Sequence, residues 1–188
     1  DVAVIKLPHI SNFTDFDALE KEPDVSLSYV DTPDALRHAD VIIIPGTKNT
    51  LGDLRWLKET GLAARVLSAL KTRSHCMLIG ICGGFQMLGR EIRDEQGIES
   101  YGKKSLALGL LPMVTHFERE KILAQVRARE NGSGLEVEGY EIHHGRTEAL
   151  HMREAFKIFS RQGKKTKGNG GYRSKDGRIW GSYIHGLF

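Results

Sequence analysis

The sequence predicts an α/β fold: an open, flavodoxin-like sheet with parallel core strands and helices on both faces, plus added antiparallel strands in the C-terminal third. Short apolar runs alternate with helical patterns through the first half of the chain. The run at 41–44 is Val-Ile-Ile-Ile, and a strand that is apolar on both faces suits the interior of a parallel sheet. Beyond residue 102, strand-like segments follow one another without full helices between them.

Hydrophobic spacing predicts the elements of the first half. Leucine and valine side chains at helical spacing predict an amphipathic helix over 61–71. An apolar strand at 76–81 is followed closely by a segment, 85–88, that is typical of the start of a helix. Further strands are expected at 2–7, 25–30 and 41–44, and a short helix at 34–38.

The C-terminal third predicts a mixed or antiparallel sheet attached to the parallel core. Strands are expected at 106–113, 122–129, 135–142 and 179–184. The segment 163–171 is rich in glycine and contains three lysines, which predicts a mobile loop. No aromatic side chain is interleaved with these lysines, so this segment does not resemble a nucleic-acid surface.

Length and composition narrow the class of protein. A chain of 188 residues with a net charge of +3 is expected to form one globular domain over 1–188. No apolar run is long enough to cross a membrane, and no export signal opens the chain. Two cysteines cannot provide a disulfide framework, so a reducing cytoplasm is the expected compartment. Because the first residue is Asp1 rather than Met, we expect a piece of a longer protein.

A candidate nucleophile lies at 80–86, where Gly-Ile-Cys-Gly-Gly-Phe-Gln joins a predicted buried strand to a predicted helix. A tight turn of this kind pushes the side chain of Cys82 out of the sheet, and flanking glycines remove the collisions that the bend would cause. The start of a helix also favours the reactive thiolate. Gly83 can donate its N–H to an oxyanion. Cys76 has no glycine near it and is expected to be structural.

A thiol nucleophile needs a base, and His185 is the candidate because it ends a predicted strand. His143 and His144 are adjacent and would point to opposite faces of a strand, so they form a poor metal pair. No spacing of Cys, His and carboxylates demands a metal. The loop at 45–50 follows a buried strand and can offer backbone N–H groups to an anion, but it lacks the pattern of a phosphate-binding P-loop.

The motif at 80–89, Gly-Ile-Cys-Gly-Gly-Phe-Gln-Met-Leu-Gly, resembles the nucleophile motif of class I glutamine amidotransferases. Further stretches narrow the resemblance to the C-terminal glutaminase domain of the cobyric acid synthase family. Of these, Ser-Asn-Phe-Thr-Asp-Phe-Asp at 11–17 is the most specific, and the others lie at 45–48, 139–143 and 183–186. The resemblance covers nearly the whole chain.

The resemblance implies a glutaminase that supplies ammonia for amidation of corrin-ring carboxylates in cobalamin biosynthesis. It implies Cys82 as nucleophile and His185 as base and then acid. Gly46 and Gly83 would form the oxyanion hole, and Gln86 would contact the bound glutamine. ATP and Mg²⁺ would be used by an N-terminal synthetase domain upstream of residue 1, where the corrinoid substrate binds. No cofactor, nucleic acid or membrane is expected for the domain itself.

One departure leaves a question open. Class I amidotransferases often carry a glutamate two residues after the histidine, whereas here Gly186 and Leu187 follow His185. Glu141 or a backbone carbonyl could orient the imidazole, and His143 could contact the substrate. The alternatives are the related a,c-diamide synthases, a peptidoglycan-modifying amidotransferase, a cysteine hydrolase or deglycase on the same scaffold, and a binding module with an inactive site.

Overall fold

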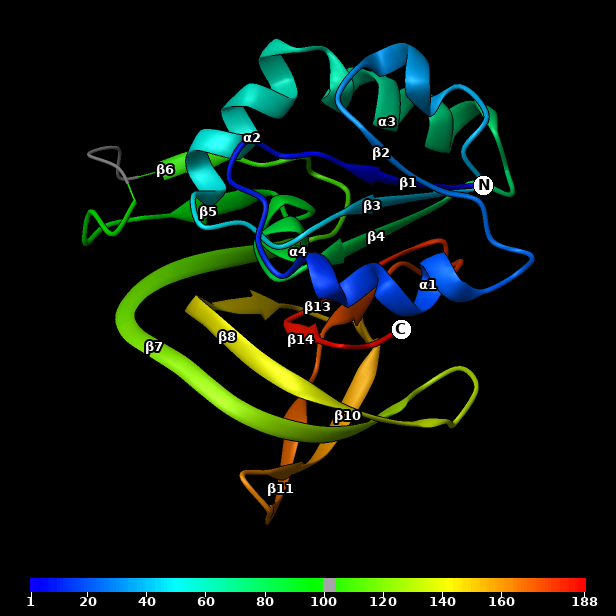
Figure 1. The fold of residues 1–188 in the computed structure, drawn as a ribbon. Coiled ribbons are helices and arrows are strands. Elements are labelled where there is room, and N and C mark those ends of the chain that lie inside the picture. Colours follow the sequence, from blue (N-terminus) through cyan, green and yellow to red (C-terminus); the bar gives the residue numbers. More distant parts are fainter. Residues whose placement is uncertain (100–103) are drawn as a thin grey trace.

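The computed structural model describes residues 1–99 and 104–188 and contains two sheets (Figure 1). The first has the strand order β2-β1-β3-β4-β13-β12-β9, and its first five strands run parallel. The second has the order β11-β10-β7-β5-β6, with β8 paired to β7 and β14 paired to β8. The strands are β1 (Val2–Ile5), β2 (Leu27–Val30), β3 (Val41–Ile44), β4 (Met77–Ile81), β5 (Glu91–Arg93), β6 (Lys104–Leu106), β7 (Met113–Glu130), β8 (Glu136–Ala149), β9 (Arg153–Glu154), β10 (Phe156–Arg161), β11 (Lys164–Asn169), β12 (Tyr172–Arg173), β13 (Ile179–Ser182) and β14 (Ile184–His185).

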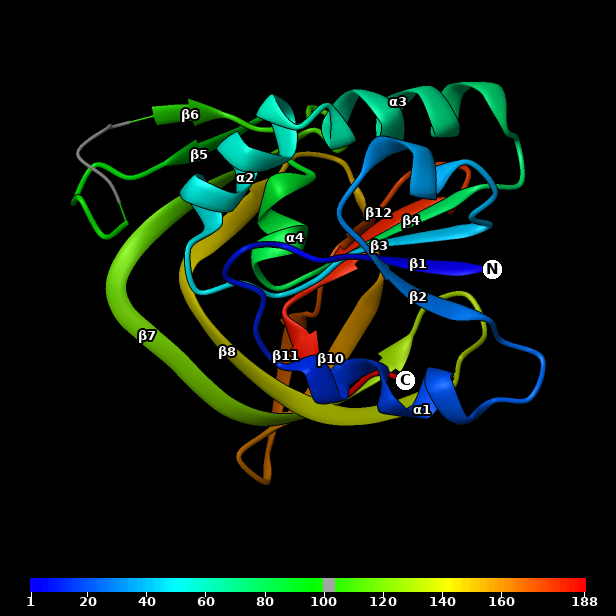
Figure 2. The same ribbon diagram turned by 45° about the horizontal axis from the view of Figure 1, so that its top comes forward.

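Helices cover both faces of the parallel sheet (Figure 2). The α-helices are α1 (Asp17–Lys21), α2 (Thr50–Glu59), α3 (Leu62–Thr72) and α4 (Gly83–Met87), and the 3-10 helices are η1 (Phe13–Phe16) and η2 (Pro33–Leu36). Ile42 and Ile44 pack in the core cluster that contains the apolar side chains of α2 and α3. Ile43 faces the opposite side and packs with Phe16 of η1. The β-branched strand β3 is therefore buried on both faces, as the sequence predicted.

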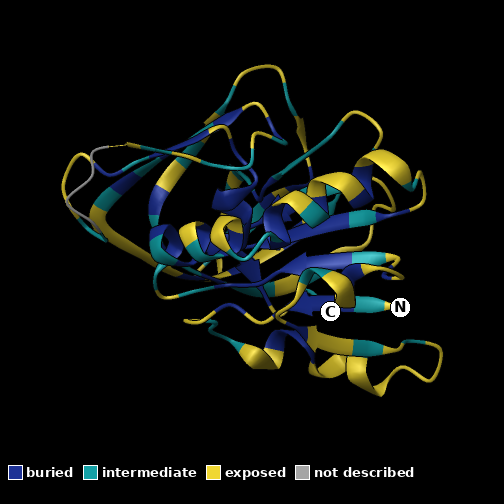
Figure 3. Ribbon diagram, turned by 90° about the horizontal axis from the view of Figure 1, so that it is seen from above, coloured by how far each residue is buried: buried dark blue, intermediate teal, exposed yellow. Residues whose placement is uncertain are grey.

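The core strands are buried and the outward faces of the helices are exposed (Figure 3). Short, buried parallel strands are typical of a sheet covered on both faces. Within the described residues, no helix combines the length and the apolar composition needed to cross a bilayer.

The prediction of a strand over 106–113 was wrong. Only its two ends lie in strands, since Leu106 ends β6 and Met113 begins β7, and residues between them form hydrogen bonds around the end of α4. The N–H groups of Leu110 and Leu111 both donate to the Leu88 carbonyl, at 3.0 and 2.9 Å. Gly109, at φ 71°, turns the backbone there. The apolar run therefore satisfies the free carbonyls at a helix end instead of pairing in a sheet.

The prediction of a mobile loop at 163–171 was also wrong, because β11 occupies most of it and pairs with β10 as a hairpin. Gln162 and Gly163 form the turn and both have positive φ, 49° and 72°. Positive φ at both central residues is what a type I′ hairpin turn requires. The predicted strand over 179–184 is two strands in different sheets, β13 and β14, separated at Tyr183.

Candidate active site

Cys82 occupies the bend between β4 and α4, with φ 52° and ψ −109°. Such a backbone is strained for a residue with a side chain, and strain of this kind gathers at functional sites. The glycines around it are required by close approach. A Cβ on Gly80 would lie 2.7 Å from the Gly84 carbonyl oxygen, and a Cβ on Gly84 would overlap the carbonyl oxygen of Ile44. The sequence around the thiol therefore permits the bend that presents it.

His185 reaches the thiol because of the register of the parallel sheet. β13 runs parallel to β4, with Ser182 opposite Ile81, so the chain leaves β13 next to the bend at Cys82. It then enters the second sheet as β14, where His185 lies opposite Tyr140 of β8. The rings of Tyr140 and His185 stack with centroids 5.2 Å apart. The thiol and the imidazole thus come from different sheets and line one cavity.

Asp15 orients the imidazole. Its Oδ2 accepts a hydrogen bond from Nδ1 of His185 at 2.6 Å, and its Oδ1 accepts from the Gly186 N–H at 3.0 Å. The amide nitrogen of Asn12, a residue in the left-handed region at φ 57°, lies 3.0 Å from Nδ1 and 3.1 Å from Nε2. Asp15 was not predicted as a site residue, although it lies in the Ser-Asn-Phe-Thr-Asp-Phe-Asp stretch that carried the family resemblance.

The electrostatics of His185 follow from these contacts. Burial alone would lower its pKa, but hydrogen bonds and charge interactions with Asp15 and with the Cys82 thiol prevail and raise the pKa to about 9. An imidazole held in this way can keep a proton next to the thiol at neutral pH. A thiol, a histidine and a carboxylate therefore form a connected series, the arrangement that activates a nucleophile.

A cavity of about 250 Å³ opens beside the thiol, near the lower limit for sites that bind small molecules. Its walls come from both sheets and from the loops after β1 and β3. The lining residues are Ser11, Asn12, Thr47, Lys48, Thr50, Cys82, Gln86, Glu99, Lys121, Ile142, His143, His144 and His185. Within residues 1–99 and 104–188, no acceptor takes a hydrogen bond from the N–H of Gly46 or of Gly83. Both glycines adjoin the site: a Cβ on Gly46 would meet the His185 ring at 3.1 Å, and Gly83 follows the thiol.

Gln86 lies in this cavity with its side chain fixed at both ends. Its Nε2 donates to the His144 carbonyl at 2.9 Å and to the Tyr183 hydroxyl at 3.2 Å. Its Oε1 accepts from the Thr50 hydroxyl at 3.3 Å. The Tyr183 hydroxyl also lies 2.6 Å from the Thr147 hydroxyl. A side chain held by this many partners is pre-organised rather than free to rotate.

Glu141 and His143 occupy different positions relative to the thiol. Glu141 is buried, but its carboxylate accepts from Arg161 at 3.0 and 3.2 Å, so Asp15 and not Glu141 is the carboxylate on His185. His143 lines the cavity. Its Nδ1–H donates to the Gly145 carbonyl at 3.0 Å, and burial lowers its pKa to about 4, which keeps the ring neutral.

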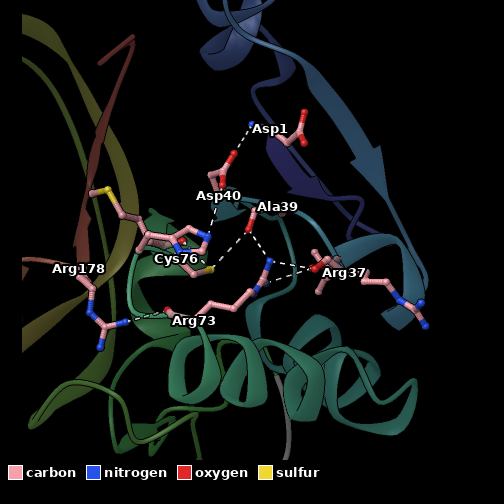
Figure 4. Close-up of polar contacts among 10 residues, drawn as sticks. Asp1, Arg37, Ala39, Asp40, Arg73, Cys76 and Arg178 are labelled. Atoms are coloured by element: carbon pink, nitrogen blue, oxygen red, sulfur yellow. Dashed lines mark hydrogen bonds and ion pairs between the residues drawn. The ribbon is translucent and has the colours of Figure 1, made fainter.

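Cys76 and Cys82 flank opposite ends of β4, and Figure 4 shows the polar contacts around Cys76. Its side chain is fully buried, and its Sγ lies 3.7 Å from the Ala39 carbonyl oxygen. The guanidinium of Arg73 donates to the same carbonyl at 2.8 Å. Burial raises the pKa of the Cys76 thiol, which disfavours the reactive thiolate. These contacts give Cys76 the surroundings of a structural residue.

Known proteins show the same domain. Residues 1–188 match the family described as CobB/CobQ-like glutamine amidotransferase domain. The chain is 48% identical over 197 residues to a cobyric acid synthase from Moorella thermoacetica, and 43% identical over 195 residues to one from Syntrophobacter fumaroxidans. These alignments cover 100% of this chain but only 37% and 38% of the two relatives. The chain therefore spans little more than a third of the length of the curated relatives it matches.

Solved structures share the fold. The chain superposes with a TM-score of 0.70 on PurLQS from Thermotoga maritima, at 18% identity, covering 98% of this chain and 86% of that one. It superposes with a TM-score of 0.69 on a glutamine amidotransferase at 16% identity, covering 99% and 90%. The predicted fold class and family are thereby confirmed. The chain belongs to the family of CobB/CobQ-like glutamine amidotransferase domains.

Proposed function

We propose that this domain hydrolyses glutamine through a thioester on Cys82, with His185 as base and then acid. The observation that carries the proposal is the series from Asp15 to His185 to the strained cysteine, at the edge of a cavity of amino-acid size. Cys82 first gives its proton to His185, and the resulting thiolate attacks the γ-carbonyl carbon of glutamine. The N–H groups of Gly46 and Gly83 stabilise the oxyanion that forms.

His185 then passes its proton to the departing nitrogen, and ammonia leaves as the carbon–nitrogen bond breaks. A water molecule attacks the thioester carbonyl, gives up a proton to His185, and releases glutamate and the free thiol. Asp15 holds the imidazole in one orientation throughout. Gln86, fixed by its hydrogen bonds, contacts the bound glutamine.

The names of the relatives support a proposal for the destination of the ammonia. The two relatives described above are named cobyric acid synthase, and this chain accounts for little more than a third of their length. We propose that the rest of such a polypeptide is an N-terminal synthetase domain. That domain would use ATP and Mg²⁺ to activate carboxylates of a corrinoid, which the ammonia from Cys82 then converts to amides.

The proposed chemistry is tested with diazo-oxo-norleucine, a glutamine-like electrophile. We expect mass spectrometry to find one adduct, on Cys82, and we expect glutamine to slow its formation. His185→Ala should slow labelling and abolish release of glutamate. Modification of another residue, or labelling that is indifferent to both glutamine and His185, would contradict the mechanism. Amide formation on a corrinoid acid, measured with the complete polypeptide, ATP and Mg²⁺, tests the second part separately.

A further inference from the structure

Glu99 lies in the wall of the Cys82 cavity but has no place in the chemistry at the thiol. The loop that carries it is built around a buried carboxylate. Oδ1 and Oδ2 of Asp94 accept hydrogen bonds from the N–H groups of Ile98 and Glu99, at 2.7 and 3.0 Å. Asp94 therefore fixes the backbone of Glu99, and the Glu99 side chain points toward α2 and the cavity.

The carboxylate of Glu99 has hydrogen-bond donors but no cation. Its Oε2 accepts from the Leu51 N–H at 2.8 Å, and the backbone N–H of Thr50 also donates to the carboxylate. Desolvation nevertheless raises its pKa. No Lys, Arg or His in the described ranges forms an ion pair with it, in contrast to the buried Glu141, which pairs with Arg161. Removing a carboxylate from water costs free energy, and without a neighbouring cation this cost is not fully offset. A bound ligand with a positive group would provide the missing ion pair.

A short hydrogen-bonded chain joins Glu99 to the glutamine-contacting residue of the site. The Thr50 hydroxyl donates to Oε1 of Gln86 at 3.3 Å and also lies against the Glu99 carboxylate. Gln86 sits one helical turn after the nucleophile, so the cavity runs from the thiol, past Gln86, to Glu99. Lys48 and Lys121 line the same cavity and can attract a carboxylate.

We propose that Glu99 binds the α-ammonium group of the substrate and so selects L-glutamine over amides that lack this group. The inference rests on the proposed glutaminase function. The inference identifies a residue that recognises the amino-acid end of the substrate, which lies away from the reacting amide. A free α-amino acid carries one positive and one negative group, and the cavity offers a carboxylate and two lysines for them.

A purely structural role for Glu99 makes a different prediction. Its carboxylate also caps the first turn of α2, where the Asn49 side chain already accepts from the Gly52 N–H at 3.0 Å. The variant Glu99→Gln keeps an oxygen acceptor for the Leu51 N–H and removes only the charge. A cap should tolerate this change, whereas an ammonium site should not. Glu95→Gln, an exposed carboxylate in the same loop, is the matched control.

The test compares hydrolysis of L-glutamine with hydrolysis of glutaramate, which has the same amide and carboxylate but no α-ammonium group, in the complete polypeptide. For Glu99→Gln we expect KM for L-glutamine to rise about 10- to 100-fold, the range for loss of a charge-assisted hydrogen bond. We expect little change with glutaramate, so the preference for L-glutamine should collapse. Glu95→Gln should retain the preference of the unaltered enzyme.

Alkylation of Cys82 by the neutral reagent chloroacetamide separates this inference from the proposed function. We expect the same alkylation rate in Glu99→Gln and in the unaltered enzyme, because the reagent has no α-ammonium group. A wild-type KM for L-glutamine in Glu99→Gln, or an equal loss with both substrates, would overturn the role of Glu99. Failure of the unaltered enzyme to hydrolyse glutamine at Cys82 would instead overturn the glutaminase function itself.

Discussion

Replacing Asp15 with asparagine removes one charge from the active site with little change in shape. Asparagine keeps an oxygen for the Gly186 N–H, but it no longer presents a carboxylate to Nδ1 of His185. The pKa of His185 is about 9, compared with an ordinary value of 6.5. The difference of about 2.5 corresponds to about 3.4 kcal/mol at 1.36 kcal/mol per pH unit. Asp15 and the Cys82 thiol share this stabilisation of the imidazolium, against the opposing effect of burial.

The expected result of Asp15→Asn is a lower pKa for His185 and a kcat for glutamine hydrolysis that falls about 10²- to 10⁴-fold. The fall has two causes: the imidazole loses its fixed tautomer, and its positive form loses a counter-charge. The assay is glutamate release between pH 5 and pH 10, with the ring protons of His185 followed by NMR. Asp17→Asn, an exposed carboxylate two residues away, should leave both measurements unchanged.

Stability should change with a defined sign. Because the folded-state pKa of His185 is raised, its contribution to the free energy of unfolding is complete below pH 6.5 and is lost as the pH rises through about 9. Asp15→Asn should therefore destabilise the protein more at pH 6 than at pH 10, as measured by urea unfolding. An unaltered pH–rate profile in Asp15→Asn, or a larger destabilisation at pH 10, would refute the assignment of Asp15.

Three further substitutions test separate parts of the structure. Cys76→Ser should keep most of the glutaminase activity, since this thiol is buried at the far end of β4 from Cys82. Cys82→Ser should abolish the activity. Equal losses in the two variants would show that both thiols serve the reaction. Gly84→Ala should lower Tm by roughly 5–10 °C, because its Cβ overlaps the Ile44 carbonyl and overpacking costs about 1–3 kcal/mol; calorimetry that finds no loss would contradict the close approach. Glu141→Gln should leave the pH–rate profile of glutamine hydrolysis unchanged, since Arg161 and not the imidazole is its partner; a displaced profile would count against that pairing.

The parallel core and the nucleophile bend could be predicted because their signals are local. The β-branched run at 41–44 and the glycines around Cys82 each depend on residues that are neighbours in the sequence. The two-residue turn at Gln162 and Gly163 was missed because glutamine is not a usual residue at positive φ. The lengths of β7 and β8 were underestimated. Exposed residues at 119–123 interrupt the alternation of apolar and polar side chains in β7, so the predicted strand at 122–129 began too late.

The carboxylate that orients His185 could not be found by spacing alone. Asp15 is 170 residues from His185 in the sequence, and the 3-10 helix η1 places its carboxylate against the imidazole. Glu141 was a candidate for orienting His185, but β8 directs its carboxylate toward Arg161. Contacts of this range depend on how separate elements pack, which a single sequence does not state. A carboxylate inside the family-specific stretch was the available signal.

The proposed nucleophile and base are carried by different sheets, since Cys82 directly follows β4 of the first and His185 is a strand residue of the second. A molecule in which β7 and β8 were unfolded would still have Cys82 in its glycine-flanked bend between β4 and α4. It would have lost the Ile142 carbonyl that the thiol faces and the Tyr140 ring that supports the imidazole. If Cys82 and His185 act as proposed, glutamine hydrolysis requires complete assembly of the domain, and a half-folded chain would not hydrolyse glutamine.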